Sequence, residues 1–327
     1  MPLCSEDDFL RLIDELFPNP PGPAGRGDDC AVLPASEELC VTTDLFLEHA
    51  HFRRSYFSPA DIGHKGLAVN VSDVAAMGAR PRAFTLDCII PDGPDGANET
   101  FWRELFTGMA DLAREYDLKL VGGDLSKGRD LGLSVTIWGT PGPGGRFLAR
   151  GGCRPGDVLF VAGALGLARC GLYTLEEHGP ASAENFPACV AAHLRPEPRV
   201  ADGLALSALP GVRGLMDVSD GLARDLPRFL RASGAPVPGA NVELREESLH
   251  PELVAWAAAR EESPAEAAFQ GGEDYALLGA ADPAHWDAIR ARLPHLAAVG
   301  AVDDRPGIRL NGAAYTREGF DHFGGKA

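Results

Sequence analysis

The sequence predicts a two-domain protein of the α/β and α+β classes, in which each domain combines helices with a β-sheet. The chain has 327 residues, and this length suits two domains. Strand-like and helix-like segments occur in both halves, and a stretch rich in glycine and proline at residues 139–157 separates them. We therefore expect an N-terminal domain at residues 1–146 and a C-terminal domain at residues 147–327.

Apolar spacing and helix-breaking residues predict the elements of the N-terminal half. Pro59 suits the first turn of a helix, and Gly78 with Pro81 marks the end of that helix. A loop with the sequence GGDLSKGRD is expected between the last two strands. In chain order we expect a helix at 5–17, strands at 30–33 and 39–47, a helix at 59–78, a strand at 83–90, a helix at 98–116, and strands at 119–121 and 131–139.

The C-terminal half predicts a further alternation of strands and helices, without a repeat of fixed period. Its clearest unit is a strand, a loop and a helix within GLMDVSDGLARDLPRFL, at residues 214–230. Around this unit we expect strands at 158–161, 241–244, 274–278 and 296–302, and helices at 164–178, 184–194, 198–208, 251–260 and 283–293.

Charge and cysteine content exclude several classes of function. The net charge of -17 argues against a broad nucleic-acid surface, which needs clustered lysine and arginine. The 7 cysteines form no CxxC pair, so we expect buried free thiols in a reducing cytoplasm. The N-terminal sequence lacks the pattern of a signal peptide, and no apolar run reaches the length of a membrane span. We therefore expect neither a nucleic-acid partner nor a membrane.

Recurring aspartates carry the strongest chemical signal. Each follows or interrupts an apolar run, where a strand or helix would deliver it to a common edge. They are Asp29, Asp44, Asp73, Asp124, Asp217 and Asp220. Carboxylates gathered at one edge repel one another unless cations neutralise them, and oxygen ligands of this kind suit Mg²⁺ that shares its shell with phosphates. The pattern predicts a site for a magnesium nucleotide or phosphate.

The neighbours of the aspartates add to this interpretation. Thr42 and Thr43 precede Asp44 with two further oxygen ligands. Asn70 and Asp73 are three residues apart, on one face of the expected helix. Each motif alone is equally typical of a turn or of a polar strand end. Their joint occurrence favours the metal site, because structural turns have no reason to place aspartate after an apolar run so often.

Glycine and hydroxyl residues supply possible phosphate contacts. Gly123 precedes Asp124 and would let backbone N–H groups approach a phosphate. Ser219 and Asp220 lie before a helix, where they would either cap that helix or present its N-terminus to phosphates. Arg150 could stabilise charge on a transferring phosphoryl group, or could be an exposed loop arginine. No P-loop, GxGxxG or HExxH motif is present.

With these motifs assembled, the chain resembles the thiamine-monophosphate kinase family, within the superfamily of aminoimidazole-ribonucleotide synthetase. The resemblance covers nearly the whole chain, in the family's order. The matching segments are GDDCAVL, TTDLFLEHAHF, KGLAVNVSDVAAMGARP, LVGGDLSKG, MDVSDGLARDL, GGEDYALL and GFDHF.

The resemblance implies an activity and an architecture. It implies transfer of the γ-phosphoryl group of ATP to thiamine monophosphate, which gives thiamine diphosphate and ADP. It further implies a homodimer in which the mixed sheets of two N-terminal domains close into a barrel, with active sites in clefts. The C-terminal domain would be a larger, sandwich-like α+β domain.

The resemblance also implies roles for individual residues. Several Mg²⁺ ions would be held by Asp29, Thr42, Thr43, Asp44, Asp73, Asp124, Asp217 and Asp220. ATP would contact Gly123, Asp124, Arg150, Ser219 and, in some relatives, a residue at the position of Phe106. Thiamine monophosphate would contact His51, Glu273 and Phe320, with the aromatic ring of Phe320 stacked on the substrate.

Three other interpretations compete with this one. Another ATP-using member of the superfamily is disfavoured by EHAHF and GGEDY, which match the thiamine enzyme. A serine hydrolase with Ser219 as nucleophile is disfavoured because Asp217 replaces the first glycine of GxSxG. A non-catalytic cation-binding protein explains the acids, but explains neither the glycine-rich turns nor Arg150.

Overall fold

The computed structural model describes residues 6–17, 38–93 and 98–317. The chain divides into two compact units, the first formed by Met1–Val74 and Arg80–Pro141 and the second by Ala75–Ala79 and Gly142–Ala327. The first unit ends at the start of the glycine- and proline-rich stretch. Each unit combines a sheet with helices, as the sequence predicts.

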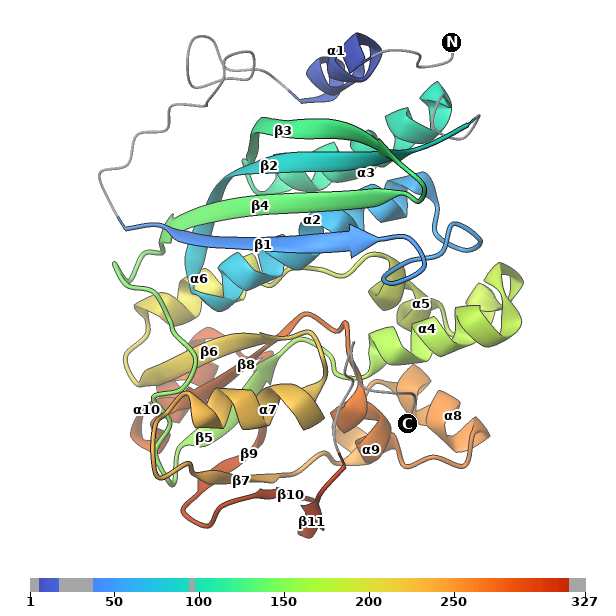
Figure 1. Ribbon diagram of the computed structural model, residues 1–327. Helices are drawn as coiled ribbons and strands as arrows, with labels where there is room; N and C mark the ends of the chain where they lie inside the picture. Colours follow the sequence, from blue (N-terminus) through green and yellow to red (C-terminus); the bar gives the residue numbers. More distant parts are fainter. Residues whose placement is uncertain (1–5, 18–37, 94–97, 318–327) are drawn as a thin grey trace. The chain divides into compact units, whose positions relative to one another are not determined.

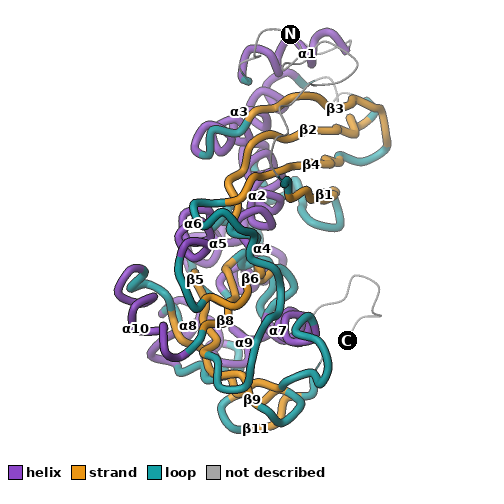
Figure 2. Tube along the Cα trace, turned by 90° about the vertical axis from the view of Figure 1, so that its left-hand side faces the viewer, coloured by secondary structure: helices purple, strands orange, loops and turns teal. Residues whose placement is uncertain are grey.

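The first unit is a four-stranded sheet with helices on one face (Figures 1 and 2). The strands lie in the order β1-β4-β2-β3, so β1 and β3 form the two edges. β1 pairs antiparallel with β4, and β2 pairs parallel with β3, which makes the sheet mixed. The strands are β1 (Cys40–Leu47), β2 (Ala79–Pro91), β3 (Lys119–Gly128) and β4 (Gly132–Pro141), and the helices are α1 (Glu6–Leu16), α2 (Pro59–Ala76) and α3 (Glu99–Glu115).

Local sequence explains where α2 begins. Ser58 accepts a hydrogen bond on Oγ from the Asp61 N–H at 3.2 Å, and its hydroxyl donates to the Asp61 carboxylate at 2.6 Å. Pro59 lies at the first helical position, where its missing N–H costs nothing. The helix then runs through the core, with Lys65 and Asn70 buried among apolar side chains. Buried polar groups of this kind need specific partners, so we expect this helix to contribute to a site as well as to the core.

The main correction in the first unit concerns the glycine-rich loop. The predicted loop GGDLSKGRD is mostly strand, because β3 continues to Gly128 and pairs with β2 along this length. Pairing with a buried neighbouring strand outweighs the turn preference of glycine and aspartate. The predicted strand at 30–33 lies outside the described residues.

The second unit is a seven-stranded sheet in the order β11-β10-β7-β9-β5-β8-β6. Most neighbouring strands are antiparallel, while β7 and β10 are parallel. The strands are β5 (Val158–Ala162), β6 (Val212–Val218), β7 (Gly239–Val242), β8 (Ala276–Ala281), β9 (Ala297–Asp303), β10 (Ile308–Leu310) and β11 (Ala313–Tyr315). The helices are α4 (Leu167–His178), α5 (Pro187–Leu194), α6 (Val200–Ala208), α7 (Leu222–Arg231), α8 (Pro251–Ala259), α9 (Pro264–Gln270) and α10 (Pro283–Arg292), with short 3₁₀ turns at Pro180–Asn185 and Glu246–Ser248.

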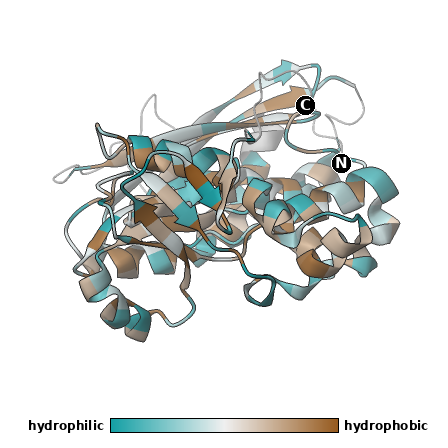
Figure 3. Ribbon diagram, turned by 90° about the horizontal axis from the view of Figure 1, so that it is seen from below, coloured by the Kyte–Doolittle hydropathy of each residue, from teal (hydrophilic) through white to brown (hydrophobic). Residues whose placement is uncertain are grey.

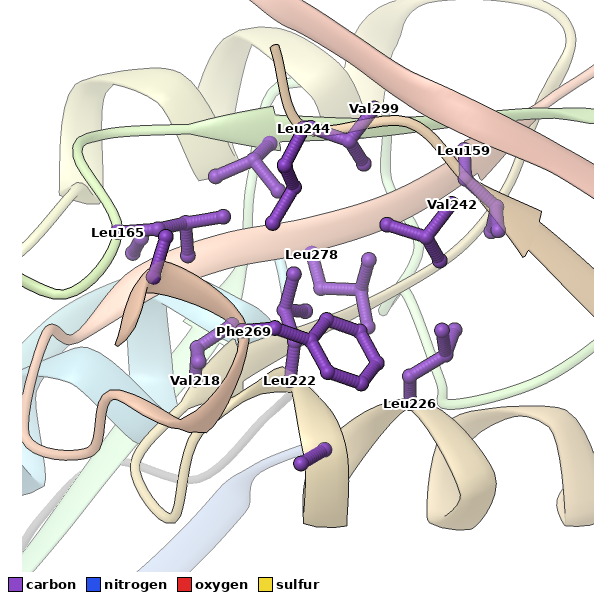
Figure 4. Close-up of a cluster of buried hydrophobic side chains, with 14 of the residues drawn as sticks. Leu159, Leu165, Val218, Leu222, Leu226, Val242, Leu244, Phe269, Leu278 and Val299 are labelled. Atoms are coloured by element: carbon purple, nitrogen blue, oxygen red, sulfur yellow. The ribbon is translucent and has the colours of Figure 1, made fainter. Parts of the chain in front are cut away.

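The core of this unit lies between the sheet and α7, α8 and α9. Leu159 on β5 and Leu278 on β8 meet Leu222 on α7 and Phe269 on α9 in this cluster (Figure 4). Phe160 alternates to the opposite face, where its ring stacks on Trp286 of α10 at 5.5 Å. Helices therefore cover both faces of the sheet. The helical ribbons in Figure 3 carry both hydrophobic and hydrophilic segments, as expected for helices with one buried face.

Several elements of the second unit differ from the prediction. The sequence did not predict α9, β10 or β11, because each is too short to produce a recognisable period. The strand expected at 274–278 begins at Ala276 instead. The cause is local, since Glu273 and Tyr275 have left-handed backbone angles that a strand cannot contain. Among the described residues, no helix is long and apolar enough to cross a membrane.

Candidate functional site

In the first unit, three predicted ligands lie together where edge strand β1 meets α2. Alternation along β1 places Thr42 and Asp44 on the side of the buried Phe46, which is the side covered by the helices. The Thr42 hydroxyl donates a hydrogen bond to Oδ2 of Asp73, on α2, at 2.7 Å. A strand and a helix thus bring two carboxylates and a hydroxyl to one place.

The electrostatics of this group are unfavourable without a cation. Burial, followed by the negative charge of Asp73, raises the pKa of Asp44 to about 6. Asn70 lies one helical turn before Asp73, and its Oδ1 is buried without a hydrogen-bond partner among the described residues. The carboxylate, hydroxyl and amide oxygens of these residues are the ligand types that a hard cation prefers. We call Thr42, Asp44 and Asp73 the β1–α2 acidic group.

Thr43 does not join the β1–α2 acidic group. Its side chain alternates to the other face of β1, where it accepts a hydrogen bond from the hydroxyl of Thr136 on β4 at 3.0 Å. Strand alternation forces this separation, since consecutive side chains point to opposite faces. The structure therefore separates a pair of threonines that the sequence suggested would act together.

Asp124 lies at the other edge of the same sheet, on β3. It is in register with Asp87 of β2, and its Oδ2 accepts a hydrogen bond from the Ser126 hydroxyl at 3.2 Å. Two strands separate β3 from β1, so one copy of the sheet does not bring Asp124 to the β1–α2 acidic group. Gly123 has a packing reason to be glycine, because a Cβ there would lie 1.8 Å from the carbonyl oxygen of Leu86.

His51 and Phe106, two predicted contact residues of the first unit, lie in different surroundings. His51 accepts a hydrogen bond on Nδ1 from the Leu47 N–H at 3.0 Å, and its ring lies 5.9 Å from the ring of Phe46. In the neutral ring, Nε2 then carries the proton and is the atom that can donate to an anion. Phe106, in contrast, is fully buried beside Trp102. The Phe106 side chain therefore packs against other core side chains, and a nucleotide could contact it only if the core opened.

In the second unit, Asp217 and Asp220 lie at the carboxyl end of β6. Asp217 is 3% exposed and faces away from the core cluster that contains its neighbours Met216 and Val218. Asp220 is in the loop that follows. Arg228 of α7 donates to its Oδ2 at 2.6 Å, and Arg224 lies 3.5 Å from the same atom. The Asp220 carboxylate is thus already neutralised by two arginines.

The start of α7 is organised by Asp225. Its Oδ2 accepts a hydrogen bond from the Asp220 N–H at 2.9 Å, and its Oδ1 accepts one from Arg228 at 3.1 Å. Burial raises the pKa of Asp225 to about 6, and the nearby arginine opposes this rise. In the described part of the chain Ser219 gives α7 no side-chain cap, and Gly221 is the N-cap residue. Asp225, which lies inside α7, therefore organises the start of the helix in place of the cap considered for Ser219 or Asp220.

The GGEDY segment forms a strained loop next to the β6–α7 turn. Glu273 and Tyr275 have φ angles of 61° and 48°, which are uncommon outside glycine and concentrate at functional sites. The Glu273 N–H donates to the carbonyl of Ser219 at 2.7 Å, and the Tyr275 N–H donates to the carbonyl of Val218 at 2.9 Å. The loop is therefore attached to the strand end that carries Asp217.

Asp274 fixes the GGEDY loop to the start of α4, a role that the sequence did not indicate. Its carboxylate accepts hydrogen bonds from the N–H groups of Gly166 at 2.6 Å and Ala168 at 3.1 Å, at the N-terminus of α4. Burial raises its pKa to about 7 in spite of these hydrogen bonds. The available signal was the acid pair in GGEDY, of which only Glu273 was considered.

The remaining predicted residues are less informative. Arg150 is exposed, on a segment held beside β6 by a hydrogen bond of 3.1 Å from the Leu215 N–H to the Ala149 carbonyl. Asp29 and Phe320 lie outside the described residues. Over 6–17, 38–93 and 98–317, no three His, Cys, Asp or Glu side chains form a metal-binding group by themselves.

Comparisons with known proteins place this geometry in context. Residues 27–140 match the family model "AIR synthase related protein, N-terminal domain". Thiamine-monophosphate kinase of Escherichia coli K12 is 35% identical over 314 residues, which are 91% of each chain. A solved structure of AaThiL complexed with AMPPCP and TMP superimposes with a TM-score of 0.78 at 30% identity, covering 97% of both chains. The hydrogenase maturation protein HypE of E. coli, at 22% identity and a TM-score of 0.77, shares the fold.

Proposed function

The chain belongs to the thiamine-monophosphate kinase family, and from this premise we propose that it transfers the γ-phosphoryl group of ATP to thiamine monophosphate. The products are thiamine diphosphate and ADP. The support is the 35% identity to the E. coli enzyme over 91% of both chains, together with the similar structure of AaThiL complexed with AMPPCP, an analogue of ATP, and TMP. The structural observation that carries the proposal is the β1–α2 acidic group, in which a strand and a helix bring two carboxylates and a hydroxyl together.

The residues of the β1–α2 acidic group fit Mg²⁺. Asp44 and Asp73 offer carboxylate oxygens, and Thr42 adds a hydroxyl oxygen. Two protein carboxylates are sufficient, because Mg²⁺ usually keeps waters and takes further ligands from substrate phosphates. When bound, Mg²⁺ ions would screen the repulsion between two phosphate-bearing substrates and stabilise the equatorial oxygens of the transferring group.

Other residues complete the proposed ligand sets. Further Mg²⁺ contacts are assigned to Asp29, Thr43, Asp124, Asp217 and Asp220. The ATP contacts are assigned to Gly123, Asp124, Arg150 and Ser219, and the thiamine monophosphate contacts to His51, Glu273 and Phe320. Thr43 can act through its backbone, since its side chain faces Thr136. Asp220 has to give up its contacts with Arg224 and Arg228 before it can bind an ion.

The transfer is proposed to be direct and in line. A phosphate acceptor is already a nucleophile, so no strong general base is required, and the protein contributes mainly position and charge. No phosphoenzyme should form. Quenching the enzyme during turnover with ATP labelled at the γ-phosphate, followed by mass spectrometry of the peptides, would detect an aspartyl phosphate and refute direct transfer.

The proposed active form is a homodimer joined through the open face of the four-stranded sheet. That face carries the exposed side chains of Val41 and Leu45 on β1, at 63% and 58% exposure, and of Ile89 on β2 at 39%. Exposed apolar side chains on one sheet face indicate an interaction surface. Closing two sheets into a barrel would also remove the unpaired edges of β1 and β3.

The first experiment is a product assay. Purified protein is incubated with ATP, Mg²⁺ and thiamine monophosphate, and thiamine diphosphate is measured by chromatography. The proposal predicts equal amounts of thiamine diphosphate and ADP, with no product in EDTA. Binding of Mg-ATP without product would instead direct the search to another phosphoryl acceptor.

A further inference from the structure

The backbone of the GGEDY loop is fixed on both sides of Glu273. Hydrogen bonds from the N–H groups of Glu273 and Tyr275 attach the loop to the end of β6. Between them, the Asp274 carboxylate holds the N-terminus of α4. The remaining freedom of Glu273 lies in its side chain, which is long, flexible and 27% exposed.

A histidine from another helix meets this side chain. Nδ1 of His193, in the last turn of α5, lies 3.0 Å from Oε2 of Glu273, and the imidazole is 1% exposed. An ionised carboxylate accepts hydrogen bonds and cannot donate them, so Nδ1 carries the hydrogen in this contact. The contact fixes one carboxylate oxygen while leaving part of the glutamate accessible.

The helix that carries His193 is itself firmly held. The side chain of Glu252 on α8 accepts hydrogen bonds from the N–H groups of Ala188 and Cys189, at 2.8 and 3.0 Å, in the first turn of α5. α4 approaches α5 at Gly171, where a Cβ would lie 2.2 Å from the Cys189 carbonyl oxygen and 2.9 Å from Cβ of His193. Such close packing leaves the imidazole little room to move.

We propose that His193 is a positioning residue for thiamine monophosphate, which holds the Glu273 carboxylate in the orientation that contacts the substrate. This inference rests on the role proposed above for Glu273. The thiazolium ring of thiamine is cationic, so an ionised carboxylate complements the thiamine part of the substrate, whereas ATP offers only anionic groups beyond its base and ribose. His193 therefore acts on the affinity for thiamine monophosphate and not on the affinity for ATP.

Steady-state kinetics of three variants test this inference. His193→Leu keeps an apolar side chain of similar size and removes the hydrogen bond, so the KM for thiamine monophosphate should rise about tenfold, as expected for loss of a hydrogen bond to a charged group. The KM for ATP should stay unchanged. His193→Asn places an amide N–H near the position of Nδ1 and should recover most of the affinity. Glu273→Gln should itself raise the KM for thiamine monophosphate.

Two comparisons separate positioning from a general packing effect. Cys189→Ala removes a buried atom from the same face of α5 and should leave both KM values unchanged, although it lowers the melting temperature. In the double variant His193→Leu with Glu273→Gln, the two effects should not add, because both remove the same interaction.

The outcomes distinguish this inference from the proposed function. A normal KM for thiamine monophosphate in His193→Leu, with a raised KM in Glu273→Gln, overturns the role of His193 alone. Full additivity in the double variant also overturns it. A normal KM in Glu273→Gln shows instead that the role proposed for Glu273 is wrong. If His193→Leu does not fold, His193→Met, which also cannot donate a hydrogen bond, takes its place, and an equal rise of the KM values for thiamine monophosphate and ATP would indicate packing only.

Discussion

Replacing Asp44 by asparagine should stabilise the metal-free protein while weakening its response to Mg²⁺. Asp44 is half-buried on β1, and both burial and the charge of Asp73 disfavour its ionised form. Asparagine has almost the same shape and carries no charge. The substitution therefore removes an electrostatic penalty without leaving a cavity.

The size of this gain follows from the pKa of Asp44. A rise from 3.8 to about 6 corresponds to at most about 3 kcal/mol, since one pKa unit is worth about 1.36 kcal/mol. Asp44 is partly exposed, and solvent screening reduces the figure to about 1–2 kcal/mol. Because the folded-state pKa is raised, the penalty develops as the pH rises from about 4 to about 6 and is complete above that range.

The assay is thermal unfolding in EDTA and in Mg²⁺ at two pH values. At pH 7.5 in EDTA, Asp44→Asn should melt about 2–6 °C above the unsubstituted protein, and at pH 4 the two should nearly coincide. Mg²⁺ should raise the melting temperature of the unsubstituted protein more than that of the variant. Turnover of the variant should be severely reduced.

Asp287→Asn is the control, because it removes the same charge from an exposed position on α10, in a helix to which no role in the site is assigned. Its melting temperature should change little. The reasoning is refuted if Asp44→Asn is less stable than the unsubstituted protein at pH 7.5 in EDTA, or if it keeps its full Mg²⁺ response. Either result would mean that burial and the charge of Asp73 do not disfavour the ionised form of Asp44.

Three further predictions follow from the same structure. Asp124→Asn should lower kcat at least tenfold. Its melting temperature in EDTA should stay within about 2 °C of the unsubstituted protein, because the Asp124 carboxylate is exposed on β3. Normal turnover of the variant would show that Asp124 is not a metal ligand. Leu45→Asp should convert a dimer into a monomer, as measured by analytical ultracentrifugation. The control Val237→Asp, at an exposed apolar position of the second unit, should remain a dimer. An unchanged mass for Leu45→Asp would exclude the open sheet face as the interface. Burial raises the pKa of Asp274 to about 7, so ionisation of Asp274 lowers the free energy of unfolding as the pH rises from about 4 to about 7. Asp274→Asn should therefore make the fall of this free energy with pH shallower. An unchanged slope would contradict the raised pKa of Asp274.

Much of the fold was predictable, because most elements have strong local signals. α2 begins at Pro59 as predicted, since a capping serine and a proline mark its start. Elements without such signals were missed, as with the seven-residue α9. β3 was predicted too short, because its glycines indicate a loop and only pairing with β2 extends the strand.

The candidate site was predictable only where its residues stand in short sequence motifs. The sequence indicated six aspartates at a common edge, with Thr42 and Thr43 beside them, and of these the structure brings Thr42, Asp44 and Asp73 together. Strand alternation should already have separated Thr43 from Asp44. The contact between His193 and Glu273 was beyond the reach of sequence patterns, because it joins two elements that only the tertiary fold brings together.

The β1–α2 acidic group and Asp220 differ in how their negative charge is compensated. This difference affects how strongly each would bind a cation. The β1–α2 acidic group keeps two carboxylates close together, and burial, followed by the charge of Asp73, raises the pKa of Asp44 to about 6. Asp220 has no such penalty to relieve, because Arg228 and Arg224 already neutralise it. A cation at the β1–α2 acidic group therefore gains from relieved repulsion, while a cation at Asp220 has to compete with two guanidinium groups. If both groups bind Mg²⁺, the β1–α2 acidic group should fill at the lower concentration, and the arginines freed from Asp220 would become available to the phosphates that accompany the second ion.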